Sequence, residues 1–301
     1  MIVAKDARYE IAAANLPLGR VRAALNLDFA LDPFTGRTIL SSSHQEPPLK
    51  VVRAFTLADG SALAHLHNVS GGLVGGDNLA LSVRVGEGAS VQLTTTGATR
   101  IYRPREEASP VSQASEISVG ENALLEYVPD AIVPFAGARY SQRTTIRLAA
   151  GAGLFWWEIL APGREARGEI FEYGSVEIKT DVFALDRRVA AERVRLEPRR
   201  RKLSDLARLG PFRYWVTFYI CRVGLSSSEW LSAECRLRGS AEAHTNSGEM
   251  LLGISTLVAH GLVIRCLARR GRGILPALHD LWNAAKLLLY GREAIPPRKV
   301  N

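Results

Sequence analysis

In the first two thirds of the chain, apolar and polar residues alternate in several short segments, and this pattern constrains the fold more than any other feature. From Leu79 to Val85, a leucine or valine occupies every second position. The same alternation recurs at residues 144–148 and 176–180. Strict period-two alternation is typical of β-strands that bury one face. The chain is therefore predicted to be mainly β before residue 200.

A weak internal repeat accompanies these strands. Three segments, GEGASVQLTT, GENALLEYVP and GAGLFWWEIL, each combine a glycine turn with a strand and each follow an alternating strand. They begin at Gly86, Gly120 and Gly151, so their starts are 34 and 31 residues apart. A recurring strand–turn–strand unit of this length predicts stacked, β-helix-like coils or a layered β-sandwich. Three ordinary hairpins of an antiparallel protein would give the same pattern, so both arrangements stay open here.

Helical patterns appear only after residue 200. Residues 275–290 carry apolar side chains near a 3.6-residue spacing, and Gly291 follows, which predicts a helix that ends at this glycine. A second helix is predicted over residues 228–238, with Ser227 or Ser228 as its N-cap. The expected fold class is thus mainly β, with about two α-helices, one of them near the C-terminus. The sequence shows no dividing linker rich in Pro, Gly or Ser, so one domain over residues 1–301 is expected.

The chain is basic, with 38 Lys and Arg against 30 Asp and Glu among 301 residues and a formal net charge of +8. A basic chain can bind nucleic acid. Here, however, the basic residues stand in short runs such as residues 199–202, without interleaved aromatic residues. Solvated loops or an acidic protein partner explain the charge better, and a basic nucleic-acid-binding β-protein stays the weaker alternative.

Cysteine usage and hydropathy indicate the compartment. The three cysteines, Cys221, Cys235 and Cys266, are odd in number, widely spaced and without a CxxC pair, which suits a reducing environment. No apolar run reaches the ~18 residues that a membrane-spanning helix needs. The charged N-terminal residues do not resemble an export signal. A cytoplasmic protein with no membrane partner is therefore expected.

A glycine-rich loop, HNVSGGLVGGD, raises the question of a phosphate site. Its glycines are Gly71, Gly72, Gly75 and Gly76, and Asp77 follows them. A phosphate loop requires a Lys-Ser/Thr pair or a helix that begins at the loop, whereas Asp77 leads into an alternating strand. The glycines are therefore predicted to serve backbone geometry, by positive φ or close approach of the chain.

Two histidines precede this loop in the tripeptide HLH. Residues i and i+2 of a strand point to the same face, so His65 and His67 could contact one metal ion. Two surface or half-buried histidines without a ligand explain the pattern better. No third histidine or cysteine lies nearby in the sequence to strengthen the metal hypothesis.

Several carboxylates stand in or next to strongly apolar segments. Glu126 lies in LLEYVPD with Asp130, Glu158 lies in LFWWEILAPGR, and Glu169 lies in RGEIFEY. A buried carboxylate is unfavourable unless it is paired or solvated by an internal channel. An outward-facing carboxylate would also fit the alternation. A second interpretation is a β-rich hydrolase, because such enzymes use paired carboxylates for acid–base chemistry.

Three long blocks, taken in order, resemble one known family. They are GGLVGGDNLALSVRVGEGASVQLTTTGATRIYR, LLEYVPDAIVPFAGARYSQRTTIRL and WWEILAPGREARGEIFEY, and the closing GREAIPPRKV also fits. Over about residues 20–300 the chain is similar to the urease accessory protein UreD, also called UreH. The specificity comes from three blocks in the family's order, rather than from one short motif.

The resemblance implies a non-catalytic, cytoplasmic chaperone for urease maturation. Family members bind apo-urease and the accessory protein UreF, which docks the GTPase UreG, and the complex delivers nickel to the urease active site. The implied fold is mostly β, with stacked strands and a pair of α-helices. No tightly bound cofactor is implied, only nickel(II) in transit.

The resemblance also gives the buried carboxylates a role, because an internal wet tunnel has been proposed for this family as the nickel route. Carboxylates and water hold nickel more weakly than imidazole or thiolate, so the ion can move on. The candidate route residues are Asp77, Glu126, Asp130, Glu158 and Glu169. Arg164 is expected to pair with one of these acids or to hold a partner loop. The family pattern assigns no role to His65 and His67.

Overall fold

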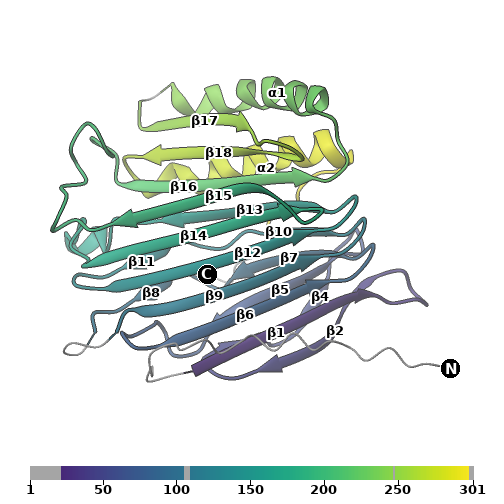
Figure 1. Cartoon of the computed structure of the whole chain (residues 1–301), viewed down its shortest axis with the longest axis horizontal. Coiled ribbons are helices and arrows are strands. Elements are labelled where there is room, and N and C mark those ends of the chain that lie inside the picture. Colours follow the sequence, from purple (N-terminus) through teal and green to yellow (C-terminus); the bar gives the residue numbers. More distant parts are fainter. Residues whose placement is uncertain (1–21, 105–108, 247, 298–301) are drawn as a thin grey trace.

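The computed structural model describes residues 22–104, 109–246 and 248–297. Two β-sheets lie face to face, and two helices cover part of one of them (Figure 1). The prediction of a mainly β fold with two α-helices, one of them near the C-terminus, is confirmed.

The first sheet has seven strands. Their spatial order is β15 (Arg187–Leu196), β14 (Ser175–Ala184), β12 (Arg139–Leu148), β9 (Val111–Val119), β6 (Asn78–Val85), β1 (Arg22–Leu31) and β2 (Thr38–Gln45). The second sheet has eleven strands. Its main path is β17 (Met250–Thr256), β18 (Gly261–Ala268), β16 (Tyr214–Arg222), β13 (Gly153–Leu160), β10 (Leu124–Tyr127), β7 (Ser90–Thr95), β5 (Ala62–Asn68) and β3 (Leu49–Lys50). Three short strands join this path, β4 (Ala54–Thr56), β8 (Thr99–Ile101) and β11 (Ile132–Pro134).

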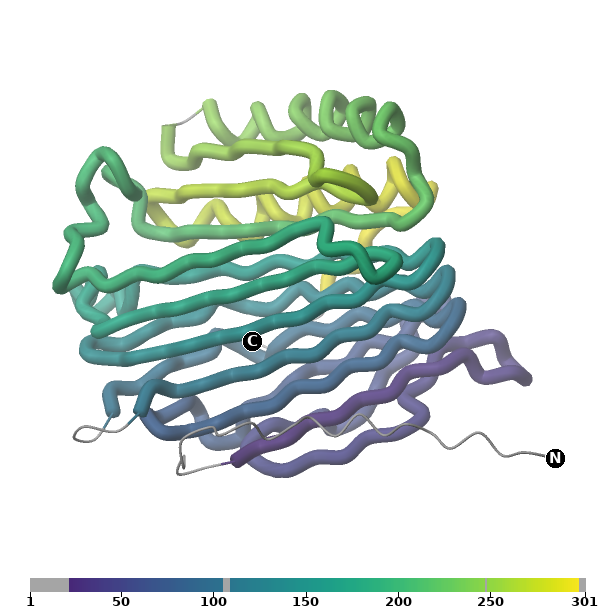
Figure 2. The backbone as a smooth tube through the Cα atoms, in the orientation of Figure 1, coloured from purple at the N-terminus to yellow at the C-terminus, as the bar shows by residue number. Residues whose placement is uncertain are grey.

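The internal repeat forms stacked coils. At each of the three glycine turns the chain crosses from the first sheet to the second, from β6 to β7, from β9 to β10 and from β12 to β13. Equivalent strands of successive coils pair in parallel within each sheet, and the tube of Figure 2 shows this winding. The turns stack too, since the amide of Gly88 donates to Glu121 O at 2.8 Å and that of Asn122 to Ala150 O at 2.9 Å. The hairpin alternative is therefore wrong.

The alternating residues point into the space between the sheets. On β6, Leu79, Leu81, Val83 and Val85 are buried there. β13 departs from this pattern because all eight of its residues are buried. Its second face is covered by helices, and the Trp157 ring packs edge-on against a helical tryptophan with ring centroids 5.9 Å apart.

The two helices pack on the outer face of the second sheet. α1 (Ser227–Thr245) begins after an N-cap at Ser226, whose side chain accepts from the Glu229 amide in a capping box. The predicted cap at Ser227 or Ser228 is therefore wrong by one or two residues, and the helix extends beyond residue 238. α2 (Ile274–Tyr290) ends at Gly291 as predicted, because this glycine adopts φ +66° as the left-handed C-cap. Within the described ranges, neither helix is long and apolar enough to cross a membrane.

Candidate functional site

A band of polar side chains crosses the interior between the two sheets and separates two apolar clusters. Along β14, Val176 and Ile178 belong to one cluster and Val182 to the other, with Thr180 between them. β12 and β13 repeat this order. Their polar members between the two clusters are Gln142 and Thr144 on β12 and Glu158 on β13. The polar residues of neighbouring strands therefore lie at one level of the sandwich.

Strand register aligns the band into two facing rows. In the first sheet, paired positions place Glu192, Thr180, Thr144 and Ser115 side by side on β15, β14, β12 and β9. In the second sheet, the paired positions on β13, β16 and β18 are Glu158, Thr217 and Arg265. Paired residues of a sheet share a face. Both rows thus face the interior at the same level.

Glu158 lies at the centre of this band. Its side chain is buried and accepts a hydrogen bond from Gln142 Nε2. Burial raises its pKa to about 8, the Gln142 hydrogen bond opposes this shift, and Glu192 adds to it by charge repulsion. An unpaired carboxylate with this pKa is mostly protonated at neutral pH.

Asp130 shares a cavity with Glu158. Its amide donates to the Thr95 hydroxyl at 2.9 Å, and that hydroxyl lies 3.2 Å from Asp130 Oδ2. The cavity offers about 50 Å³ to the centres of water-sized molecules, and its lining includes Tyr127, Tyr140 and Gln142 besides the two acids. Of the five carboxylates predicted for a nickel route, the structure brings these two together.

The band has hydrogen-bonding capacity left over. Among the described residues, the buried hydroxyls of Thr180 and Thr217 have no hydrogen-bond partner. Buried hydroxyls usually have one, often an ordered water. The cavity exceeds the ~10–15 Å³ that one water requires. The cavity lining includes Thr144 and Glu158, which pair in register with Thr180 and Thr217 respectively.

The donors around the cavity suit weak binding of a divalent cation. Carboxylate, hydroxyl and amide oxygens line it, and the described lining residues include neither cysteine nor histidine. Such oxygen donors bind nickel less tightly than thiolate or imidazole. Within the described ranges, no group of three or more His, Cys, Asp or Glu could hold a metal ion.

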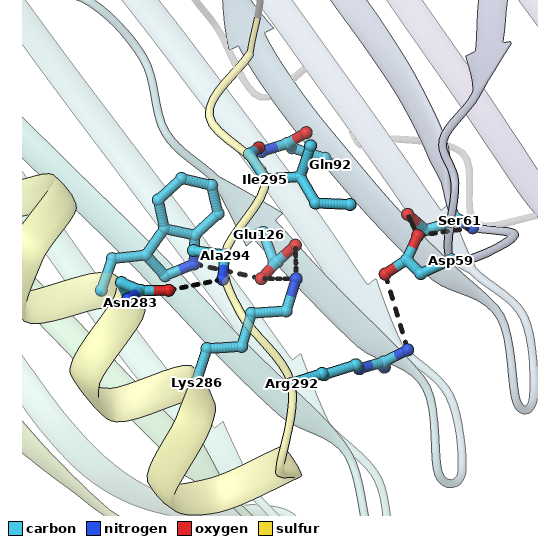
Figure 3. Close-up of polar contacts among 10 residues, drawn as sticks. Asp59, Ser61, Gln92, Glu126, Asn283, Lys286, Arg292, Ala294 and Ile295 are labelled. Carbon is cyan, nitrogen blue, oxygen red and sulfur yellow. Dashed lines mark hydrogen bonds and ion pairs between the residues drawn. The ribbon is translucent and has the colours of Figure 1, made fainter.

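Glu126 lies on the opposite face of the second sheet, under α2 (Figure 3). Its carboxylate is 2.9 Å from the ammonium of Lys286 and accepts from Trp282 Nε1 at 3.1 Å. Both Glu126 and Lys286 are nearly inaccessible, with side-chain exposures of 4% and 1%. Glu126 therefore anchors α2 to β10 and does not line the cavity of Glu158.

The segment after α2 covers this ion pair (Figure 3). The Ala294 amide donates to Asn283 Oδ1 at 2.9 Å, and Gln92 Nε2 donates to Ile295 O at 2.8 Å. Arg292 lies 3.5 Å from Asp59. The C-terminal segment is thus fixed across the outer face of the second sheet.

Asp77 and the glycine loop shape the connection between β5 and β6. The Asp77 carboxylate is buried and accepts from the Val74 amide at 2.8 Å, so it caps the turn. Gly71 and Gly76 have φ of +76° and +93°. At Gly72 and Gly75, a Cβ would overlap the Tyr102 ring and the Pro104 ring, respectively. The glycines therefore serve positive φ and close approach, and the loop leads into a strand.

Glu169 and Arg164 pair with each other in the loop after β13. Arg164 Nε donates to Glu169 Oε2 at 2.8 Å, and the same oxygen accepts from the Ala136 amide at 3.1 Å. The guanidinium also lies 4.3 Å from the centre of the Phe135 ring. These contacts hold the loop, and neither residue lines the cavity of Glu158.

His65 and His67 lie half-buried on β5, facing away from the interior that Ala64 and Leu66 line. Burial lowers the pKa of His67, and the neighbouring His65 lowers it further. The His65 ring packs edge-on to Phe55 with centroids 6.1 Å apart. The pair is outside the lining of the cavity, and metal contact at these residues stays a prediction.

Sequence reasoning missed several residues that the structure places at functional positions. Lys286, the partner of Glu126, interrupts the apolar face of the C-terminal helix, and that interruption was a usable signal. Glu192 stands among arginines in RRVAAERVRL, a context that resembles a solvated strand. Its phase with Val194 and Leu196, which alternate with arginines and pack against the interior, was the usable signal.

Comparison with known proteins identifies the class to which this fold and interior belong. The family model for the UreD urease accessory protein matches residues 21–301. This range contains every described strand and both helices. The class is that of the urease accessory proteins.

Individual relatives agree with the family model. A urease accessory protein UreD of Herpetosiphon aurantiacus is 44% identical over 283 residues, which cover 94% of this chain and 98% of that protein. That of Halalkalibacterium halodurans is 30% identical over 86% of this chain and 92% of its own length. That of Pseudomonas aeruginosa is 36% identical over 76% of each chain. The chain belongs to the UreD family.

Proposed function

We propose that this protein is a non-catalytic scaffold of urease maturation in the cytoplasm, and that nickel(II) passes through its interior on the way to urease. Its proposed partners are apo-urease, UreF and, through UreF, UreG. The observation that carries the nickel route is the polar band around Glu158, which crosses an otherwise apolar sandwich. A band of this kind is unfavourable for stability unless water or a polar cargo occupies it.

The proposed route uses Asp130 and Glu158, with Glu192 as a further carboxylate at the same level. Glu158 is mostly protonated while the site is empty, because its pKa is raised to about 8. Arrival of Ni²⁺ replaces the carboxyl proton by an oxygen–nickel contact, and the proton leaves to water. When the ion moves on, the carboxylate takes a proton again and becomes neutral. Asp77, Glu126 and Glu169 have structural roles in this proposal.

The size of the cavity and its oxygen donors support the passage of a nickel ion rather than the hydrolysis of a bound substrate. The cavity offers about 50 Å³ to the centres of water-sized molecules. This space holds water or a cation with few bound waters, but it is too small for a sugar ring. The oxygen donors release nickel more readily than sulfur or nitrogen would. A carboxylate hydrolase is therefore not favoured.

The test is a Glu158→Gln variant in a strain that expresses urease with its other accessory proteins. The amide keeps the shape and hydrogen bonding of the side chain but cannot ionise, so urease nickel content and activity should fall by about tenfold, the size of loss typical when a metal-supporting group is removed. Co-purification with urease and UreF should persist.

Asp28→Asn is the matched control, because Asp28 pairs with Arg84 at 2.7 Å on the outside of the first sheet. This variant should activate urease normally. Normal nickel loading by the Glu158→Gln variant would contradict the route. Failure of the wild-type protein to bind urease or UreF would contradict the scaffold role.

A further inference from the structure

The second sheet extends beyond the first at one edge of the sandwich. β15 is the last strand of the first sheet, whereas β16, β18 and β17 continue the second sheet past β13. Figure 1 shows β18 and β17 above β15. On β17, Leu251 is 53% exposed, which agrees with an uncovered inner face at this edge. The interior between the sheets therefore meets solvent here.

Three side chains close this edge, and they come from both sheets. Glu192 of β15 accepts from Arg265 Nη2 of β18 at 2.8 Å and from the Tyr219 hydroxyl of β16 at 3.0 Å. The Glu192 side chain is 11% exposed and that of Arg265 is 50% exposed. The contact is thus buried on its carboxylate side and open to water on its guanidinium side.

The polar rows of the interior end at this contact. Inward from Glu192 lies Thr180, and inward from Arg265 lies Thr217. These two threonines carry the buried hydroxyls without partners among the described residues. Thr217 is paired in register with Glu158. A row of polar residues in register thus leads from the edge to the central carboxylate, and the ion pair stands at its outer end.

We propose that the Glu192–Arg265–Tyr219 contact is the closure of a mouth of the polar interior, which a divalent cation passes when the Arg265 guanidinium swings into solvent. The nature of the cargo rests on the proposed function, whereas the mouth rests on the geometry alone. Arg265 acts as a positioning residue: while it is paired, it neutralises Glu192 and repels free cations. Once it has left, Glu192 becomes an anionic ligand next to the threonine hydroxyls.

The long side chain of Arg265 can make this movement without unfolding a strand. Half of its surface already faces water, and the lost hydrogen bond can be replaced by water. Tyr219 differs, because its ring is buried and stacks on Trp156 with centroids 5.7 Å apart. The hydroxyl of Tyr219 therefore keeps Glu192 oriented while Arg265 moves.

Cysteine accessibility tests the mouth without reference to nickel. In a Cys235→Ser background, which removes the exposed native thiol, Thr180→Cys places a thiol just inside the closure. The probe is a small cationic methanethiosulfonate. Adding Arg265→Ala should raise the labelling rate by about tenfold or more, since loss of a hydrogen bond to a charged group changes an opening equilibrium by such a factor. Arg265→Lys should restore slow labelling in part.

Two controls separate opening from general loosening. Arg213→Ala removes a similarly exposed arginine that pairs with Glu165 at 2.7 Å just before β16, and it should leave the rate unchanged. Buried Cys221 should stay unlabelled throughout. Equal labelling of Thr180→Cys with and without Arg265 would overturn the closure.

Urease activation with the Arg265 variants then tests the cargo. If Arg265→Ala accelerates labelling and alters nickel loading of urease, both proposals hold. If labelling accelerates while nickel loading stays normal, the edge opens but the nickel route past it is wrong. If the labelling rate does not change, the closure is wrong, whatever the outcome of Glu158→Gln.

Discussion

Glu126 and Glu158 are two carboxylates in neighbouring strands of one sheet, and the structure treats them in opposite ways. Glu126 faces the helices and is paired with Lys286 at 2.9 Å. Glu158 faces the space between the sheets, where it has Gln142 as a neutral donor and a cavity beside it. The charge of Glu126 is thus neutralised by Lys286, whereas Glu158 has no counter-ion in contact among the described residues and borders a cavity. The face of the strand on which each carboxylate lies, rather than the apolar sequence around it, decides whether it is paired with a counter-ion or borders the cavity.

The largest expected effect on stability comes from removing Lys286, the counter-ion of Glu126. Lys286→Ala leaves Glu126 buried without its partner, and breaking a buried pair on one side typically lowers the free energy of unfolding by about 3–5 kcal/mol. Denaturant unfolding measures this loss. Glu126→Gln combined with Lys286→Met should recover most of it, because no unpaired charge remains. A single variant as stable as the wild type would show that the pair does not anchor α2.

The next effect is the contribution of Glu158 to the pH dependence of stability. Its pKa is raised from the ordinary 4.5 to about 8 in the folded protein, so between these values the folded state holds a proton that the unfolded chain has released. The free energy of unfolding therefore falls as pH rises through this window, by roughly 1–3 kcal/mol for a group that relaxes partly.

Glu158→Gln should remove this slope, so the variant gains stability relative to the wild type as pH rises from 5 towards 8. Urea unfolding at several pH values measures the difference. An identical slope in both proteins would show that Glu158 is ionised in the folded state, and the contrast with Glu126 would disappear.

The smallest effect concerns the second donor to Glu126. Trp282→Phe keeps most of the packing but removes the indole N–H that lies 3.1 Å from the carboxylate. A loss of about 1 kcal/mol in the free energy of unfolding is expected for one hydrogen bond. In the Glu126→Gln background the same substitution should cost less, because the acceptor is no longer charged. Equal costs in both backgrounds would assign the effect to packing.

The sequence predicts the strands well, because alternation locates β6, β12 and β14. The glycine-turn repeat is compatible with the stacked coils of the structure, but it left ordinary hairpins open as well. The orientation of Glu126 and Glu158 could not be predicted in this way, since three of the four residues of β10 and all residues of β13 are buried, so alternation does not distinguish their two faces. Glu192 differs, because Val194 and Leu196 alternate with arginines after it and pack against the interior. This alternation could have placed Glu192 on the inner face.

The buried ion pair also has a consequence for how the protein is made. Lys286 and Glu126 are 160 residues apart, and the bond from Gln92 to Ile295 spans 203. During synthesis the second sheet therefore emerges long before the helix that covers it, with its apolar outer face uncovered and aggregation-prone. Docking of α2 onto β10 therefore has to wait until Lys286 has been synthesised. A fusion at the C-terminus should disturb this step more than one at the N-terminus.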